Sequence, residues 1–174
     1  AIAMRRLILP LTLLFIVAAC KVSNKVAEVP VQPVAVEDFV NEPFGFAETV
    51  KNFHKSFPGL KETRVLRKNV HYPEKSDTIY KLYSRKSSVM IYKTHFNREM
   101  LLGGVILDKR IKLRNGITVG ASREEVQEAF TNLPKGASST DTLKISSEAD
   151  LRTLKFVFDD KGKVKRISFS GYVD

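Results

Sequence analysis

The sequence predicts an α+β domain in which short helices pack on an antiparallel sheet. Two segments have apolar residues at helical spacing, and several others are rich in the β-branched and aromatic residues that favour strands. One predicted strand also alternates apolar with charged residues. Such alternation leaves one face in water, which is typical of antiparallel sheets because parallel sheets are usually covered on both faces.

The N-terminal segment, residues 4–20, has the features of a secretion signal. Two arginines follow Met4, a mostly apolar run covers residues 7–17, and two alanines precede Cys20. The apolar run is too short to cross a membrane as a helix, which needs about 20 residues. We therefore expect a signal peptide that is recognised and removed, rather than kept as a membrane anchor.

The end of this segment, Val17-Ala18-Ala19-Cys20, resembles the bacterial lipobox. In lipoproteins with this motif, diacylglycerol is attached to the cysteine sulfur and a signal peptidase cuts just before that residue. The resemblance implies lipidation of Cys20 and attachment to a membrane through that lipid. Because Cys20 is the only cysteine, the mature domain would have no free thiol for a disulfide, a zinc site or a nucleophile.

Residues 21–43 contain three prolines among valines, alanines and scattered acids, with no sustained period. We interpret this segment as a flexible tether that holds the domain away from the lipid surface. The alternative is that part of it packs as an edge strand through Val34 and Val36, which favour strands. The globular domain is then expected over residues 44–174.

The first half of this domain is expected to be one helix followed by strands. The helix is predicted by four apolar residues at helical spacing, Phe46, Val50, Phe53 and Phe57. Pro58-Gly59 should end it. Strands are predicted for residues 64–70, 79–84, 87–96 and 103–113. Lys109 interrupts the alternation of the last strand and indicates a turn or a bulge.

The second half repeats this order with a helix and a hairpin. Ser122 and Glu125 form the pattern of a capping box at the start of a helix whose apolar face includes Val126 and Phe130. Two strands, 152–159 and 163–172, follow on either side of a turn in which Gly162 can adopt a positive φ. The order of elements suggests two similar halves, 44–114 and 115–174, as tandem helix-plus-sheet modules.

Residues 116–126, Gly-Ile-Thr-Val-Gly-Ala-Ser-Arg-Glu-Glu-Val, run on to Phe130 and resemble the opening of the SmpA/OmlA (BamE-like) lipoprotein modules. In that family, a short capped helix is followed by strands joined through a glycine turn, similar to the segment from Phe156 to Val164. The resemblance covers about the last third of the chain. The related fold of β-lactamase inhibitor proteins is a tandem pair of helix-plus-sheet modules and would accommodate two halves.

The basic residues concentrate in the middle of the chain, where residues 61–114 contain 14 Lys and Arg against five Asp and Glu. A candidate surface for an anionic ligand or a partner includes Arg64, Arg67, Lys68, Arg110 and Lys112. Clustered positive charge attracts anionic lipid headgroups, acidic polymers and acidic proteins. The alternative is that these residues are solvated outer positions of strands, where lysines protect sheet edges. The export signal argues against nucleic acid as a partner.

No pattern in the sequence indicates catalysis. His54, His71 and His95 are the only histidines, and they lack the spacing of a metal site or a catalytic triad. A glycine-rich phosphate loop is also missing from the sequence. We therefore expect no enzymatic activity, no metal and no cofactor.

These observations together predict a non-enzymatic envelope lipoprotein that binds another protein or supports an assembly complex. The alternative is a binder of anionic lipid or envelope polysaccharide through residues 61–114, and a third reading is an inhibitor or an enzyme in the same compartment. In the lipoproteins that this chain resembles, the absence of Asp after the cysteine goes with sorting to the outer membrane in Gram-negative cells. Lys21 occupies that position here.

Overall fold

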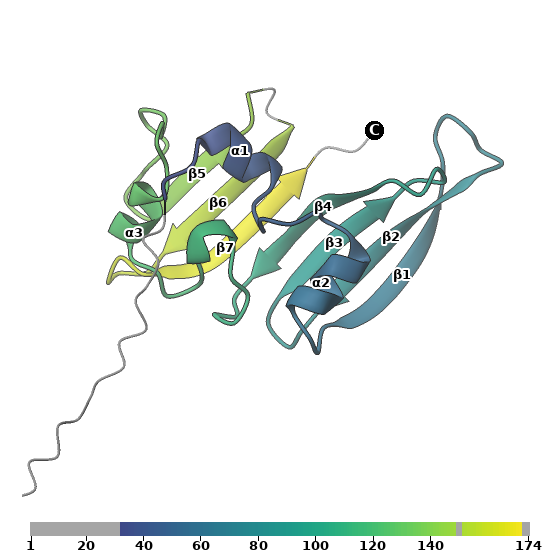
Figure 1. The fold of residues 1–174 in the computed structure, drawn as a ribbon, viewed down its shortest axis with the longest axis horizontal. Coiled ribbons are helices and arrows are strands. Elements are labelled where there is room, and N and C mark those ends of the chain that lie inside the picture. The colour runs from purple at the N-terminus through teal and green to yellow at the C-terminus, as the bar shows by residue number, and fades with distance from the viewer. Residues whose placement is uncertain (1–31, 149–150, 172–174) are drawn as a thin grey trace, which may run out of the picture.

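The computed structural model describes residues 32–148 and 151–171. Seven strands form one antiparallel sheet in the order β1-β2-β3-β4-β7-β6-β5 (Figure 1). The strands are β1 (Lys61–Lys68), β2 (Ser76–Tyr83), β3 (Ser88–Lys93), β4 (Glu99–Ile106), β5 (Thr142–Ser146), β6 (Arg152–Phe158) and β7 (Val164–Gly171). The helices are α1 (Val36–Asn41), α2 (Val50–Ser56) and α3 (Arg123–Glu128), with a 3-10 turn at Arg114–Gly116. The prediction of helices with an antiparallel sheet is confirmed, but the sheet dominates.

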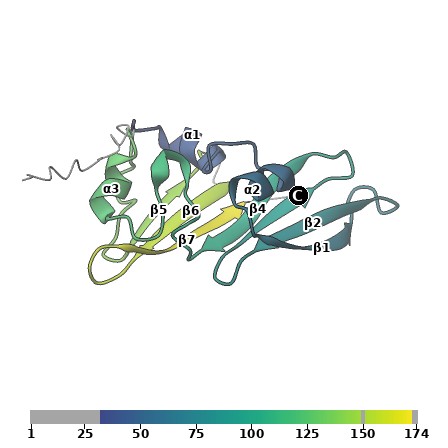
Figure 2. The same ribbon diagram turned by 60° about the horizontal axis from the view of Figure 1, so that its bottom comes forward.

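The three helices lie on the same side of the sheet (Figure 2). Strand β6 shows why, because Leu154, Phe156 and Phe158 are each at most 1% exposed. Lys155, which lies between them, is exposed. Successive side chains of a strand point to opposite faces, so the apolar set faces the helices and forms the core. We call the other side, which none of the described helices covers, the open face.

The tether predicted for residues 21–43 is wrong in its C-terminal part. Residues 36–41 form helix α1, in which Val36, Phe39 and Val40 are buried, and the Phe39 ring packs edge-to-face on Phe130 with centroids 5.0 Å apart. Six residues are too few to show a period in the sequence, although the spacing of these three is that of one helical face. Residues 21–31 lie outside the described residues.

The alternative of an edge strand through Val34 and Val36 is also wrong. Val34 makes only an isolated bridge to Phe130, and Val36 is the first residue of α1. The Val34 N–H donates to the Ala129 carbonyl at 2.9 Å. The globular domain therefore begins near Val34 rather than at residue 44.

The first predicted helix is present but shorter than expected. It begins at Val50, where the Thr49 side chain accepts a hydrogen bond from the Asn52 N–H at 3.2 Å. Phe46 precedes the helix but packs against Phe53, with ring centroids 5.3 Å apart. The four apolar residues at helical spacing therefore indicated the core correctly, whereas the capping Thr49 determines where the helix begins.

Four strands occur near the predicted positions, but the last of them ends earlier than expected. Strand β4 stops at Ile106, and the Ile111 N–H donates to the Asp108 carbonyl in a turn that includes Lys109. Ile111 and Leu113 remain buried. The alternation of apolar and charged residues in 107–113 therefore reflects a loop with buried apolar residues, not an extended strand.

In the second half, the capping box of α3 and the hairpin of β6 and β7 are confirmed. The Ser122 side chain accepts from the Glu125 N–H, and the Glu125 carboxylate accepts from the Ser122 N–H. Gly162 has φ of 69° in the hairpin turn. Strand β5 was not predicted, because a five-residue strand gives a weak periodic signal.

The two halves meet where β4 pairs with β7. Four residue pairs, from Gly103 opposite Ser170 to Ile106 opposite Ile167, join them into one sheet. A Cβ atom at Gly104 would lie 2.6 Å from the Ser88 carbonyl oxygen, so glycine is required beside the bulge between β3 and β4. Helix α1 packs on β5 and β6, and α2, which follows it in the chain, packs on β2 of the first half.

Replacing Phe39 with alanine should lower the free energy of unfolding by about 3–5 kcal/mol, because it removes a fully buried ring between α1 and the sheet. Urea denaturation measures this change. Lys51→Ala on the exposed side of α2 is the control and should shift stability by less than about 0.5 kcal/mol. Equal stability of the two variants would contradict the docking of α1.

Candidate functional site: the open face of the sheet

The open face is built from alternate residues of all seven strands. Side chains directly opposite each other on neighbouring strands point to the same side of a sheet, so the pairing register defines rows across it. One row crosses the whole sheet through Lys144, Lys155, Ser168, Val105, Ser88, Tyr83 and Lys61. The next contains Ser146, Thr153, Ser170, Gly103, Met90, Lys81 and Thr63.

Basic side chains gather at both ends of this face. They are Lys144, Lys155 and Arg166 on β5 to β7, and Lys61, Arg67 and Lys81 on β1 and β2. All six residues are exposed. Within the described ranges none of the six is in an ion pair. The face therefore presents unneutralised positive charge.

Lys144 and Lys155 are directly opposite each other across β5 and β6. Like charges at such a position destabilise a sheet, whereas an acid at either position would stabilise it. Ser168 is the next residue in the same row, and Arg166 lies two residues away on β7. An anionic group above these residues would relieve the repulsion, so this end of the face is suited to bind one.

The middle of the open face has small side chains. Where β4 and β7 pair, it presents Gly103, Val105, Ser168 and Ser170. These residues place few atoms above the backbone, and none of them carries a charge. A partner could therefore approach the centre of the sheet closely while its charged groups meet the basic residues at either end.

Asp77 is the only carboxylate that the pairing register places on this face, and it is 1% exposed. It accepts hydrogen bonds from the Tyr92 hydroxyl, the Asn69 side-chain amide (2.7 Å) and the His95 backbone N–H (2.8 Å). Burial alone would raise the pKa of Asp77, but these hydrogen bonds lower it to about 2. The carboxylate is therefore ionised and fully used inside the structure.

The Asp77 contacts also fix an aromatic group at one end of the sheet. They tie Asn69 and His95 together, and Tyr72 and Phe96 pack on the His95 ring with centroids 5.4 and 3.8 Å away. Tyr72 is 50% exposed and Phe96 is 74% exposed. A rigidly held, exposed aromatic pair is a common feature of protein interfaces.

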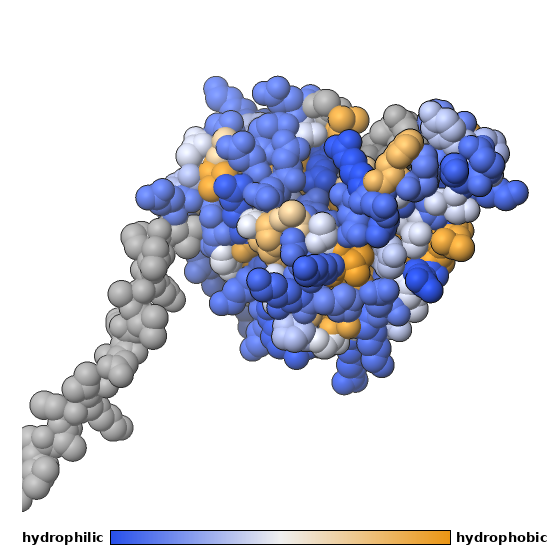
Figure 3. Space-filling model, turned by 45° about the vertical axis from the view of Figure 1, so that its right-hand side comes forward, coloured by the Kyte–Doolittle hydropathy of each residue, from blue (hydrophilic) through white to orange (hydrophobic). Residues whose placement is uncertain are grey.

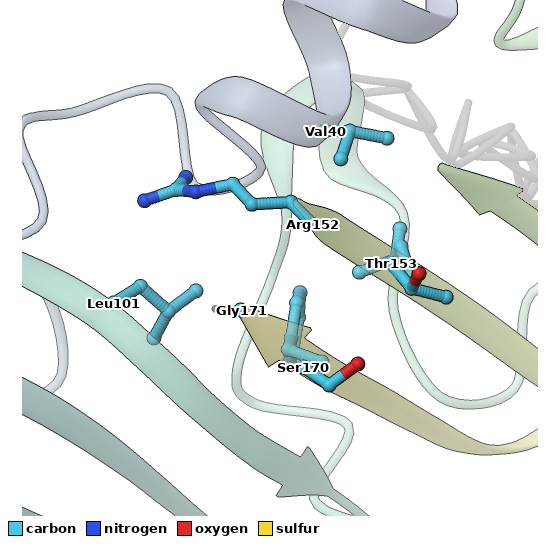
Figure 4. A pocket seen from close by; sticks show the side chains of 8 residues that line it. Val40, Leu101, Arg152, Thr153, Ser170 and Gly171 are labelled. Carbon is cyan, nitrogen blue, oxygen red and sulfur yellow. The ribbon is translucent and has the colours of Figure 1, made fainter. Parts of the chain in front are cut away.

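Figure 4 shows a pocket that lies between α1 and the sheet and is lined by Val40, Leu101 and Arg152 among others. Its volume is about 10 Å³, which is room for one water molecule. Arg152 donates to the Glu48 carboxylate at 2.7 Å and to the Asn41 carbonyl at 2.6 Å. Burial raises the pKa of Glu48, and the ion pair with Arg152 offsets part of this effect. These contacts join the N-terminal segment to β6 and leave no space for a small-molecule ligand.

A larger groove of about 280 Å³ lies beside the loop that precedes β1. Phe57, Leu60 and Ile111 form its apolar part, and Asp108 and Arg110 form its polar part. Arg110 donates two hydrogen bonds to the Asp108 Oδ2 atom, one from Nε at 3.1 Å and one from Nη2 at 2.6 Å. The charge of Arg110 is therefore neutralised locally.

The structure separates the five basic residues that the sequence grouped together. Arg64, Arg67 and Lys68 are on β1, but only Arg67 faces the open side. Arg110 and Lys112 are in the loop after β4 rather than on a strand of the open face, and Arg110 lines the groove. They do not form one patch.

Sequence reasoning missed Lys144, Lys155 and Arg166. Residues 115–174 contain equal numbers of basic and acidic residues, so their net charge of zero concealed these three. Three of the nine acids, Glu124, Glu125 and Glu128, lie in α3 on the covered side, whereas these three basic residues lie on the open face. The alternation of Thr142–Ser146, with Lys144 between two apolar residues, was the available signal.

The histidines do not form a common site. His54 contacts Glu62 at 3.0 Å, His71 is in the loop after β1, and His95 contacts Asp77. Over residues 32–148 and 151–171, no group of three or more His, Cys, Asp or Glu could hold a metal ion. In the same ranges, no helix is long and apolar enough to span a membrane. The predicted lipidation site, Cys20, lies outside them.

Comparisons with protein-family models, curated proteins and solved structures find no match.

The stability of the protein should fall between pH 4 and pH 2 in part because of Asp77. Its pKa of about 2 in the folded chain is below the ordinary value of 3.8, so its stabilising effect is present above pH 4 and is lost as the pH falls toward 2. The difference corresponds to about 2 kcal/mol. The Asp77→Asn variant should have a free energy of unfolding lower by about this amount at pH 7. Its free energy of unfolding should also depend less on pH between pH 4 and pH 2.

Urea denaturation at several pH values measures this difference. Asp108 titrates in the same range, because hydrogen bonds from Arg110 hold its pKa at about 2. Its contribution is present in both proteins and cancels in the comparison. Parallel stability curves for the native chain and Asp77→Asn would contradict the role assigned to the carboxylate.

Proposed function

We propose that this protein is a non-enzymatic, lipid-anchored envelope protein whose open sheet face binds an acidic surface of another protein. The observation that supports this most directly is the open face itself, which spans seven strands and presents six basic residues that form no ion pair with any described residue. Among the described strand residues, the buried Asp77 is its only carboxylate. Electrostatic complementarity of this kind favours fast and selective association with an acidic partner.

The dimensions of the face favour a macromolecule over a small ligand. Seven strands at about 4.8 Å spacing give a width of about 29 Å, which is comparable to a protein interface of standard size. The pocket beneath α1 holds only about one water molecule, and the groove of about 280 Å³ is lined by none of the six basic residues of the open face. The exposed rings of Tyr72 and Phe96 at the end of the sheet would add apolar contact area to such an interface.

The proposed anchor is a lipid on Cys20, as the resemblance of residues 17–20 to a lipobox suggests. Only eleven residues separate Cys20 from Gln32, the first described residue. A chain of that length spans at most about 40 Å. The domain would therefore work close to its membrane, which in a Gram-negative cell we expect to be the periplasmic face of the outer membrane.

We further propose that the domain consists of two tandem helix-plus-sheet modules. Helix α2 is followed by β1 to β4, and helix α3 is followed by β5 to β7. The last strand of each part lies at the centre of the sheet, where β4 pairs with β7. This arrangement supports the resemblance to the SmpA/OmlA and β-lactamase inhibitor folds.

Reversing three charges on the open face should disrupt partner binding. In the variant Lys144→Glu, Lys155→Glu and Arg166→Glu, crosslinking of the tagged, lipidated protein in its native membrane should capture about tenfold less of a stoichiometric partner. Lys51→Glu, Lys55→Glu and Lys112→Glu change the net charge equally at exposed positions away from the open face and should leave capture unchanged. Equal capture by both variants would exclude the open face as the binding surface.

The alternative function is binding of anionic lipid or envelope polysaccharide, which the unneutralised Lys144 and Lys155 pair would favour. Such binding should weaken steeply between low and moderate salt, because exposed charges are screened. Cosedimentation with vesicles that contain anionic lipid measures it. Reversal of Arg64, Arg67, Lys68, Arg110 and Lys112 should abolish binding if residues 61–114 carry the site. Binding that withstands this reversal but not the reversal on β5 to β7 would move the site to the open face.

A further inference from the structure

The two edges of the sheet differ in how they are protected. At the β5 edge, the segment before the strand folds back, and the Lys144 N–H donates to the Ala137 carbonyl at 2.8 Å while Ser138 bridges to Leu143. At the β1 edge, β2 is the only strand among residues 32–148 and 151–171 that pairs with residues 61–68. Strand β1 therefore presents an unpaired row of backbone donors and acceptors along its outer side.

Strand β1 lacks most features that usually protect an edge. It is eight residues long, contains no proline and pairs with β2 in a continuous register without a bulge. All eight residues are exposed, including Val65 at 64% and Leu66 at 71%. In Figure 3, which brings the β1 side forward, the hydrophobic surface appears as small separate patches within a hydrophilic surround. Charge is the one protective device that remains.

The charges along β1 define what the edge can accept. The sequence from Arg64 to Lys68 places basic residues on both sides of Val65 and Leu66. Glu62, the only acid in the strand, contacts His54 at 3.0 Å. The four basic residues Lys61, Arg64, Arg67 and Lys68 form no ion pair within the described ranges. A complementary strand would have apolar residues at its centre and acids on either side.

We propose that β1 is a strand-addition site for an extended acidic segment of a partner protein. The added strand would satisfy the outer backbone groups of β1 and place apolar side chains beside Val65 and Leu66. Its acids would meet Arg64 on the helix side and Arg67 on the open side. A second copy of the chain is a poor occupant, because antiparallel pairing of two β1 strands would bring eight basic residues together against two acids.

This site shares Lys61 and Arg67 with the open face but does not include Lys144, Lys155 and Arg166, which lie at the opposite end of the sheet. Variants at those three residues therefore test the open face without changing β1. One partner could use both surfaces, since an added strand would lie next to the basic residues of β1 and β2. The two surfaces make different demands: the edge requires an extended backbone, whereas the open face requires only negative charge.

The test uses the full lipidated chain in nanodiscs and the synthetic peptide Ser-Glu-Glu-Val-Ile-Glu-Glu-Thr. Hydrogen exchange followed by mass spectrometry should show exchange in residues 61–68 slowed about threefold or more at saturating peptide. The same peptide with N-methyl groups on alternate backbone amides keeps its side chains and charge but cannot pair along one edge. It should give no slowing at β1.

Arg64→Glu with Arg67→Glu should weaken peptide binding about tenfold, whereas Lys51→Glu with Lys55→Glu on α2 should leave it unchanged. The proposal is overturned if the peptide slows exchange only in residues 142–146 and 152–158, because binding would then be at the open face. It is also overturned if the methylated peptide protects β1 equally, if no segment is protected, or if sedimentation shows a dimer lost on Val65→Lys.

Discussion

One-sided burial is the constraint on which the rest of this structure depends. The three α-helices that the structure describes are short, and all three lie on one face of the seven-stranded sheet. The fully buried large side chains, such as Phe39, Phe156 and Ile106, therefore come together in a single layer. Alternate residues of every strand must then remain in water, which frees the opposite face to carry charge without a desolvation cost.

The same constraint determines how charge is distributed. A basic residue on the open face costs little while it is solvated, but Lys144 and Lys155 still repel each other across β5 and β6. The fold tolerates this because each lysine is exposed and its charge is screened. Three of the nine acids of the second half lie in α3, where Glu124 and Glu125 complement the helix N-terminus. Local stability thus explains these acids, whereas the paired lysines lack a local stabilising role.

The sequence predicted those elements whose signals are local. Three such features each depend on a few neighbouring residues, and all three are present: the capping box at Ser122, the hairpin turn at Gly162 and the apolar residues at helical spacing around Phe53. Helix α1 was missed because it is too short to show a period and is stabilised by distant partners, such as Phe130 and Arg152. Propensity is a weak guide where tertiary contacts decide the conformation.

The candidate surface was predicted less well than the fold, and for a different reason. Grouping charges along the chain assumes that neighbours in sequence are neighbours in space, but a strand sends Arg64 and Arg67 to opposite faces. Grouping charges along the sequence also cannot show that Arg110 forms an ion pair with Asp108. The open face becomes visible only once the register aligns Lys144, Lys155 and Lys61 in one row across seven strands.

The position of α1 connects the proposed anchor to the fold. The N-terminal helices contact both halves of the sheet. Phe39 of α1 is buried against the second half, and α2, a few residues later, packs on the first. Arg152 holds this crossing through Asn41 and Glu48. A lipid on Cys20 would therefore pull on a segment that contributes to the core of the sheet at both ends. Helix α1, the first described element after Cys20, lies on the covered side of the sheet, opposite the open face.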